Sequence, residues 1–296
     1  MSTENIKIVA TVVLYNPDDI VYDNIATYVS FIDKLIVIDN STKHNTQLIN
    51  KIETSFNNMI YINNNDNLGI ATALNIACDR AMELGYEWIL TMDQDSKFVN
   101  FEEYKYCLSE IIKKEKDIAI VTLKHTHDVG SIKIESNLCG YEEKDIVITS
   151  GNFVNLYLFD KIGRFDDSLF IDMVDYDFSH KVIVNGYKIV QMSQHYLIHQ
   201  LGEVFMRKNF LTGKVKEKIE HNPQRVYYMT RNRLYLSKKY SALSPREYSL
   251  LKTVNILFIH DVIKILLYED NKIDKLYAKC LGLYHFVIGR YGKYDI

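Results

Sequence analysis

The sequence lacks long apolar runs, paired cysteines, internal repeats and low-complexity linkers, and these absences narrow the class of protein. No apolar run reaches the roughly 18–20 residues of a membrane-spanning helix, so we expect no span. Met1 to Asn5 show neither region of a signal peptide, so we expect a cytoplasmic protein. Because no C-x-x-C pair occurs, we expect reduced thiols at the four cysteines, Cys78, Cys107, Cys139 and Cys280.

The chain has 296 residues, of which 47% are hydrophobic and 25% are charged, as in an ordinary globular protein. This length allows one large domain, or one domain with an appendage. The net charge is only −3, but residues 207–296 hold 18 Lys and Arg against 8 Asp and Glu, a balance of +10. A helical appendage packed on an acidic domain would explain this asymmetry. A basic face that meets anionic lipid or a pyrophosphate would explain it as well.

The N-terminal half alternates β-branched runs with helical spacing. The continuous run at 7–15 is typical of a central parallel strand that is buried on both faces. Further strands are predicted at 34–38, 59–62 and 88–92, and helices at 20–30, 46–56 and 70–84. This β-α-β order predicts an α/β fold with a doubly wound, mostly parallel sheet.

The remainder of the chain is less regular at first and helical at its end. Predicted strands lie at 118–123, 146–149 and 188–192, and predicted helices at 101–116, 175–185, 224–239, 245–267 and 273–288.

An acidic turn follows the strand predicted at 88–92. Asp93 and Asp95 lie at its carboxyl end, which is the edge where open α/β sheets bind ligands. Two carboxylates there suit Mg²⁺ or Mn²⁺, and such a cation suits a diphosphate. Asp is also common in ordinary turns. His199 follows another apolar strand and is an acceptable third ligand for Mn²⁺, although a single His is more often a surface or core residue.

Polar residues also follow the first two predicted strands. Tyr15 and Asn16 end the first strand and Asp39 ends the second, where a carboxylate can bind a base N–H or a ribose hydroxyl. Gly69 precedes a helix, where it lets the backbone approach a phosphate. Each is an ordinary turn residue on its own, and their placement at one sheet edge predicts a nucleotide site.

A second acidic cluster holds Asp172, Asp175 and Asp177. Together with the predicted nucleotide site and His199, this cluster points to the transfer of a sugar from a nucleotide diphosphate. Such a transfer, when it inverts the anomeric carbon, needs one carboxylate to take the proton of the acceptor hydroxyl. A metal can hold the charge of a departing diphosphate, so no general acid is required. Asp175 stands at a predicted helix start, where the dipole favours its charged form. Without this context the cluster would be a helix cap and a solvated turn.

Segments spread along the chain carry a family resemblance: Val13-Leu14-Tyr15-Asn16, Ile38-Asp39-Asn40-Ser41, Asn67 to Asn75, Asp93-Gln94-Asp95-Ser96, Thr149 to Asn152, Phe170 to Asp175, His199-x-Leu201-Gly202, and Arg231-Asn232-x-Leu234-Tyr235. As an ordered set they resemble the family 2 glycosyltransferases of the GT-A fold, inverting enzymes that build bacterial polysaccharides, and most closely their rhamnosyltransferase-like branch. The resemblance covers roughly residues 7–240. It departs at Val174, where many members have an acidic residue on the acceptor side.

The resemblance implies a role for each of these residues. Asp175 would be the catalytic base. Asp95 would be the main ligand of Mn²⁺ or Mg²⁺, with Asp93 beside the metal or the ribose of the donor and His199 near the metal. The nucleotide side is expected at Tyr15, Asn16, Asp39, Gly69 and Asp93, and the acceptor side at Ser150, Gly151, Asp172 and Arg231.

The resemblance also implies a domain organisation. We expect a GT-A catalytic domain at 1–222, with a nucleotide-sugar half at about 1–97 and an acceptor half at about 98–222. A basic helical region at 223–296 is expected to follow.

The implied function is metal-dependent, inverting transfer of a sugar, first of all L-rhamnose from dTDP-L-rhamnose, to a capsule or O-antigen acceptor. UDP-galactofuranose or another UDP-hexose is the alternative donor. A catalytically silent nucleotide- or glycan-binding module is the rival of another class, and the intact set of acidic residues and His199 argues against it. A nucleotidyltransferase would need a Gly-rich, basic N-terminal signature, which Leu14-Tyr15-Asn16-Pro17 is not. No aromatic stacking motif accompanies the basic residues, so we expect no nucleic-acid partner.

Two apolar runs, 250–259 and 262–267, lie within the basic region. Lys252 and Lys264 interrupt them, so they are too polar to span a bilayer but could lie in its interface. This predicts a peripheral site on the inner face of the membrane, which would suit a polyprenyl-diphosphate-linked acceptor. Alternatively, the apolar face covers the catalytic domain or a second subunit of a homo-oligomer.

Overall fold

A computed structural model describes residues 6–127, 139–199, 204–208 and 215–296. The chain forms two compact units: one holds Met1–Asp166 and Phe178–Gln200, and the other holds Asp167–Asp177 and Leu201–Ile296. The division that we predict at residue 222, between a catalytic domain and a basic helical region, stays a prediction. Leu201 and Gly202, part of the His199 segment, lie outside the described residues.

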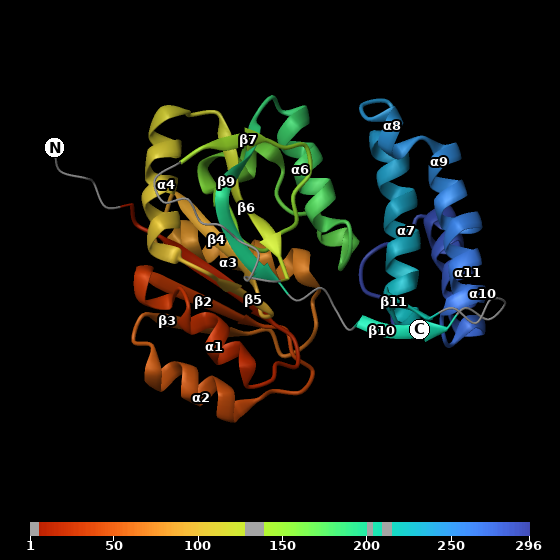
Figure 1. Ribbon diagram of the computed structural model, residues 1–296, viewed down its shortest axis with the longest axis horizontal. Helices are drawn as coiled ribbons and strands as arrows, with labels where there is room; N and C mark the ends of the chain where they lie inside the picture. The colour runs from red at the N-terminus through yellow and green to blue at the C-terminus, as the bar shows by residue number, and fades with distance from the viewer. Residues whose placement is uncertain (1–5, 128–138, 200–203, 209–214) are drawn as a thin grey trace. The chain divides into compact units, whose positions relative to one another are not determined.

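The first unit is built on a mixed sheet, shown in Figure 1. Within the described ranges it has nine strands, in the order β3-β2-β1-β4-β8-β6-β9-β5, with β7 beside β9. The strands β3, β2, β1 and β4 run parallel, as predicted, and β6 runs parallel to β9. The strands are β1 Val9–Leu14, β2 Lys34–Asp39, β3 Met59–Asn63, β4 Trp88–Asp93, β5 Ser96–Phe98, β6 Ile118–Thr126, β7 Tyr141–Glu143, β8 Asn152–Asn155 and β9 Lys188–His199.

Helices cover both faces of this sheet. Alternate side chains of a strand point to opposite faces of the sheet. Every residue of β1 is buried, so both of its faces are covered. One layer holds α1, α2 and α4, whose apolar stripes join a single core with β1 and β2. On the other face, α3 contacts β1, β2 and β4. The first unit's helices are α1 Ile20–Ala26, η1 Val29–Phe31, α2 Thr46–Ser55, α3 Ile70–Glu83, α4 Phe101–Lys114, α5 Leu156–Ile162 and most of α6 Val174–Val184.

The second unit is mainly helical. Its core is aromatic, with Phe170 stacked on Tyr228 at 5.0 Å between ring centroids. The long helix α7 begins at Pro223 behind Asn222, whose side chain accepts from the backbone N–H of Arg225. No helix in the described part of the chain has the length and apolar character needed to cross a bilayer. The elements are η2 Asp167–Leu169, β10 Val204–Lys208, β11 Val215–Ile219, α7 Pro223–Tyr240, α8 Pro245–Tyr248, α9 Leu250–Val254, the π-helix η3 Asn255–His260, α10 Asp261–Tyr268 and α11 Lys272–Ile288.

Three sequence-based predictions of secondary structure are wrong. Residues 146–149 form no strand, and the strand near them is β8, which lies antiparallel between β4 and β6. The single helix predicted at 245–267 is divided into α8, α9, η3 and α10. Strand β9 runs on to His199, because its second half pairs with both β5 and β6.

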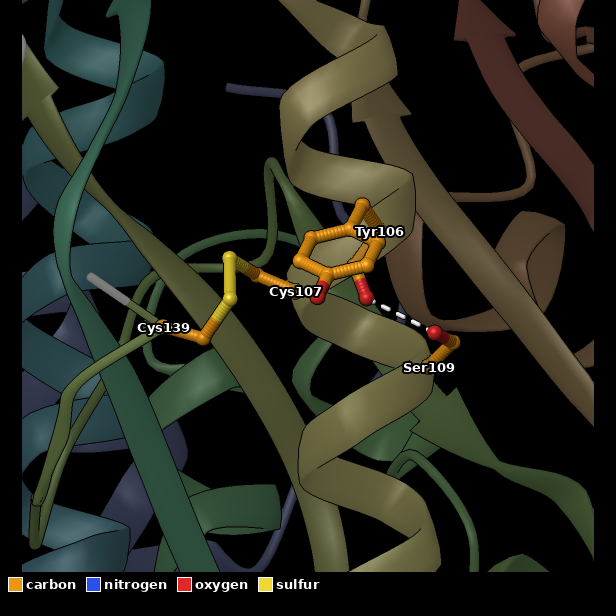
Figure 2. Close-up of a disulfide and its surroundings, with 4 residues drawn as sticks. All are labelled: Tyr106, Cys107, Ser109 and Cys139. Carbon is orange, nitrogen blue, oxygen red and sulfur yellow. Dashed lines mark hydrogen bonds between the residues drawn. A yellow bond between two sulfur atoms is a disulfide. The ribbon is translucent and has the colours of Figure 1, made fainter. Parts of the chain in front are cut away.

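The prediction that all four cysteines are reduced thiols is also wrong. Cys107 and Cys139 form a disulfide, which Figure 2 shows. Their Cα atoms lie 4.9 Å apart. Cys107 lies on the buried stripe of α4, and Cys139 lies two residues before β7. The pair was hidden because it joins segments 32 residues apart through a tertiary contact. Cys78 and Cys280 are free thiols.

Candidate active site

The predicted metal group converges in the first unit. Asp93, Asp95 and His199 each place one ligand atom within 4.8 Å of the others. Nδ1 of His199 lies 3.4 Å from Oδ1 of Asp95, and their side chains are 12% and 40% exposed. Two carboxylates and an imidazole at this spacing fit Mn²⁺ or Mg²⁺, and the exposed side leaves room for diphosphate or water oxygens.

Strand pairing brings His199 to the acidic turn. Ser96 directly follows Asp95 and begins β5, and this strand pairs antiparallel with the end of β9, with Ser96 opposite His199. Two residues that are 103 positions apart in the sequence therefore meet, and the Oγ atom of Ser96 lies 2.6 Å from Nδ1 of His199.

A chain of buried hydroxyls continues from this contact. Ser150 Oγ donates to Ser96 Oγ at 2.8 Å and accepts from the backbone N–H of Asp93 at 3.0 Å. Ser96 and Ser150 are 1% and 0% exposed, so these bonds are shielded from water. These hydrogen bonds connect Asp93 to His199 and support both residues.

Gly151 lets Ser150 reach this position. Its φ of +79° is unfavourable for other residues, and a Cβ atom would lie 3.0 Å from a methyl group of Leu197. Ser150 and Gly151 thus lie beside the metal group. Their assignment to the acceptor side stays a prediction.

Gln94, between the two aspartates, binds the turn to the residue that follows β1. Its Oε1 accepts from the backbone N–H of Tyr15 at 2.8 Å, and its Nε2 donates to the carbonyl oxygen of Tyr15 at 3.3 Å. Asn24 of α1 donates to the Gln94 carbonyl oxygen at 2.8 Å. The acidic turn is therefore held against the first predicted nucleotide residue.

Hydrogen bonds connect the remaining nucleotide-side residues along the same sheet edge. The N–H of Asn16 donates to Ser41 Oγ at 2.8 Å. Asn40 donates from its side chain to the carbonyl oxygen of Gly69 at 2.9 Å. Gly69 has a φ of +86° and is the N-cap residue of α3, so the structure brings the predicted set together at the carboxyl ends of β1, β2 and β4.

Asp39 is more buried than the sequence suggests, with 1% of its surface exposed. Its carboxylate accepts from Tyr61 Oη at 2.6 Å and from the N–H of Ser41 at 2.9 Å, and it pairs with His44 Nδ1 at 2.9 Å. Burial alone would raise the pKa of Asp39, but the hydrogen bonds from Ser41, Tyr61 and His44 outweigh it and lower this pKa. The group is a charged carboxylate at neutral pH.

His125, at the end of β6, borders the metal group from another side. Its Nε2–H donates to the Ser150 carbonyl oxygen at 2.8 Å, and its ring meets His199 edge-on at 6.0 Å between centroids. Burial lowers the pKa of His125, and the neighbouring His199 adds to this effect. A neutral imidazole therefore supports Ser150 from behind.

The predicted base segment belongs to the second unit. Asp175 stands in the first turn of α6, where the helix dipole favours a carboxylate. Asp172 precedes it, and Oδ1 of Asp172 accepts from Arg225 Nε at 3.1 Å. Burial raises the pKa of Asp172, and Arg225 opposes the rise. Asp177 is fully buried and pairs with Lys239 at 2.7 Å, which gives it a structural role.

Arg231, predicted on the acceptor side, lies in the middle of α7 with no exposed surface. Its guanidinium donates to backbone oxygens of Ser168, Leu169 and Gly292. A direct contact with an acceptor would require these bonds to break.

Sequence reasoning missed the supporting residues. Gln94 and Ser96 had a signal, because they lie inside and directly after the acidic turn. His44, Tyr61 and His125 had none, because they reach the site through tertiary contacts.

Comparison with known proteins agrees with this geometry. The profile of the family described as Glycosyl transferase family 2 matches residues 12–155. The chain is 27% identical over 278 residues to the dTDP-rhamnosyl transferase RfbF of Shigella flexneri, a match that covers 86% of this chain and 89% of that protein.

Two solved structures are similar in fold. GalNAc-T7 with UDP, GalNAc and Mn²⁺ has a TM-score of 0.57 at 12% identity, over 97% of this chain and 58% of that chain. The mannosyltransferase PcManGT of Pyrobaculum calidifontis, with GDP-Man and Mn²⁺, has a TM-score of 0.57 at 10% identity, over 96% of this chain and 74% of that chain. The chain carries a glycosyl transferase family 2 domain in a GT-A-like fold, and it is a glycosyltransferase.

Proposed function

We propose that the chain is an inverting rhamnosyltransferase, which moves L-rhamnose from dTDP-L-rhamnose to a growing surface polysaccharide such as a capsule or an O-antigen. The observation that carries the donor is the match to a dTDP-rhamnosyl transferase over most of both chains. The convergence of Asp93, Asp95 and His199 supports a donor that contains a diphosphate.

The nucleotide occupies the edge formed by the ends of β1, β2 and β4. Tyr15 and Asn16 border it, and Asp39 lies beneath it as a charged carboxylate. Gly69 allows a phosphate to approach the N-terminus of α3. Asp93 then lies beside the ribose or the metal.

Asp95, His199 and Asp93 would hold Mn²⁺ or Mg²⁺. When bound, the cation neutralises charge that develops on the departing diphosphate. The imidazole of His199 favours Mn²⁺ over Mg²⁺.

Asp175 is the general base of this proposal. Its carboxylate takes the proton of the acceptor hydroxyl as that oxygen bonds to the anomeric carbon. The bond from this carbon to the diphosphate breaks on the opposite face, so the configuration inverts and dTDP leaves. Asp175 carries the proton until solvent removes it.

The acceptor side involves Ser150, Gly151, Asp172 and, indirectly, Arg231. A polyprenyl-diphosphate-linked glycan is the proposed acceptor. The basic balance of residues 207–296 and the exposed apolar side chains of α9 to α11 support peripheral attachment to the cytoplasmic face of a membrane.

A panel of nucleotide sugars tests the function. The full chain is incubated with Mn²⁺, a lipid-linked acceptor and dTDP-L-rhamnose, UDP-galactofuranose, UDP-glucose or GDP-mannose, and release of nucleoside diphosphate is measured. Acceptor-dependent release with dTDP-L-rhamnose alone is expected. Turnover of a UDP-hexose instead would replace the donor, and tight nucleotide binding without turnover of any donor would favour a silent binding module.

A further inference from the structure

The backbone just before Asp175 is strained. Phe170, Asp172 and Met173 have φ angles of 64°, 62° and 66°, in the left-handed region that side chains other than glycine rarely adopt. Asp175 follows two residues later, in the first turn of α6. Such conformations persist only where the surroundings hold them, and they cluster at functional sites.

One buried amide holds this turn from behind. Nδ2 of Asn232 donates to three carbonyl oxygens, those of Leu169 at 2.9 Å, Ile171 at 2.7 Å and Asp172 at 3.0 Å. Because carbonyl oxygens only accept hydrogen bonds, the partners themselves decide which end of the amide faces them.

Arg231 completes the support. Its Nε donates to Oδ1 of Asn232 at 3.0 Å and so orients the amide. Its Nη2 donates to the carbonyl oxygens of Ser168 at 3.2 Å and Leu169 at 3.1 Å, and its Nη1 donates to that of Gly292 at 2.8 Å. The Gly292 N–H in turn donates to the Ser168 carbonyl oxygen at 2.7 Å.

This use of two polar side chains is unusual for simple packing. Arg231 and Asn232 are 0% exposed, and five of the hydrogen bonds that they donate go to the backbone of one short segment, residues 168–172. Two leucines at these positions would fill the space without the free-energy cost of burying a charge. Their donors match the segment that precedes Asp175, which points to control of its conformation.

We propose that Arg231 and Asn232 are positioning residues, which hold the segment 168–173 with its three left-handed residues and thereby orient Asp175 for proton transfer. The proposal rests on the proposed function of Asp175 as general base. Because the side chains of Arg231 and Asn232 are fully buried, they would act on the reaction through the backbone segment that they hold.

The substitution Asn232→Asp tests this role, because it keeps the size of the side chain and turns an N–H donor into an oxygen that repels three carbonyl oxygens. We expect kcat to fall by about 10²-fold, the effect of a misplacement of about 1 Å, with the donor KM nearly unchanged. The matched control is Asn58→Asp in the first unit, where the amide donates to the carbonyl oxygens of Val29 at 3.3 Å and Ile32 at 3.0 Å. The control should keep its kcat.

A double-mutant cycle separates positioning from general damage. If Asn232 acts through Asp175, adding Asn232→Asp to Asp175→Asn should change the residual rate by less than about twofold. An equal loss in both backgrounds, or an unchanged kcat in a folded Asn232→Asp protein, would overturn the proposal. If Asn232→Asp does not fold, Arg231→Lys carries the same cycle, because lysine keeps the charge and loses the forked donors. An active Asp175→Asn protein would instead refute the base assignment itself.

Discussion

The hydroxyl oxygen of Ser96 lies 2.6 Å from Nδ1 of His199 and ties the acidic turn to the end of β9. The same oxygen accepts from Ser150, which in turn accepts from the backbone N–H of Asp93. The metal group is therefore oriented by buried partners that are not themselves ligands.

Ser96→Ala should weaken the binding of the metal ion without removing any of its ligands. Loss of a hydrogen-bond partner behind a ligand typically costs about 10–100-fold in metal affinity or activity, and we expect this range for activation by Mn²⁺. His199→Ala should have a larger effect and shift the metal preference toward Mg²⁺. Metal titrations of initial rate, with circular dichroism to verify folding, measure both. Unchanged metal dependence in both variants would mean that His199 is an ordinary core residue and not a metal ligand.

Asp95→Ala should abolish transfer and weaken the binding of nucleoside diphosphate in the presence of Mn²⁺. Asp95 is 40% exposed at the side chain, so its removal should leave the fold intact. Calorimetric titration of dTDP with and without EDTA gives the metal-dependent part of the affinity. Full transfer activity in EDTA would contradict the assignment.

Asp175→Asn keeps the size of the base and removes its basicity. The rate should fall by about 10²–10⁴-fold while the affinity for the donor stays close to that of the wild type. Steady-state kinetics with a saturating acceptor measure the two effects separately. A mild effect here together with a severe effect of Asp172→Asn would move the base to Asp172.

Asp39→Asn should lower the free energy of unfolding by about 1–3 kcal/mol at pH 7, because hydrogen bonds to a charged carboxylate are lost. The folded pKa of Asp39 is lowered, so its contribution is present above the usual carboxyl pKa of about 3.9 and disappears as the pH falls through the lowered value. The difference between wild type and variant should therefore shrink below about pH 4. Urea denaturation across this range, with exposed Asp23→Asn as control, provides the comparison. A difference that does not depend on pH would mean that Asp39 is uncharged in the folded protein.

Exposed apolar residues of the second unit should mediate membrane attachment. Leu251 is 86% exposed and Ile273 is 83% exposed. Binding to phosphatidylglycerol vesicles should fall with added salt and with Leu251→Glu or Ile273→Glu, whereas Tyr106→Glu in the first unit should not matter. Flotation at low salt measures the bound fraction. A folded protein that does not float would show that this face packs within the chain or on a second copy.

Periodicity in the sequence was sufficient for the parallel half of the sheet. The β-branched run of β1 and the helical spacing of α3 each reflect burial on defined faces, which a pattern can reveal. Strands β2 and β4 end in Asp39 and Asp93, and the parallel topology brings both residues to the edge of the sheet where the nucleotide site is predicted.

The remaining features depend on contacts that no local pattern records. The apolar run at 146–149 resembles a strand, yet β8 lies a few residues later, where the antiparallel gap between β4 and β6 needs it. Gln94 and Asn232 act through hydrogen bonds to distant backbone, which leave no periodic signal in the sequence.

The bond between Cys107 and Cys139 gives the same sequence two covalent forms. Closing a loop across a separation of 32 residues removes freedom from the unfolded chain, worth about 3–4 kcal/mol in the chain-entropy model. A glutathione-rich compartment would keep the two thiols reduced, and an oxidising compartment would preserve the disulfide. The redox state of its surroundings therefore decides how firmly α4 is tied to the segment before β7, and a stability measured for this protein describes one redox form only.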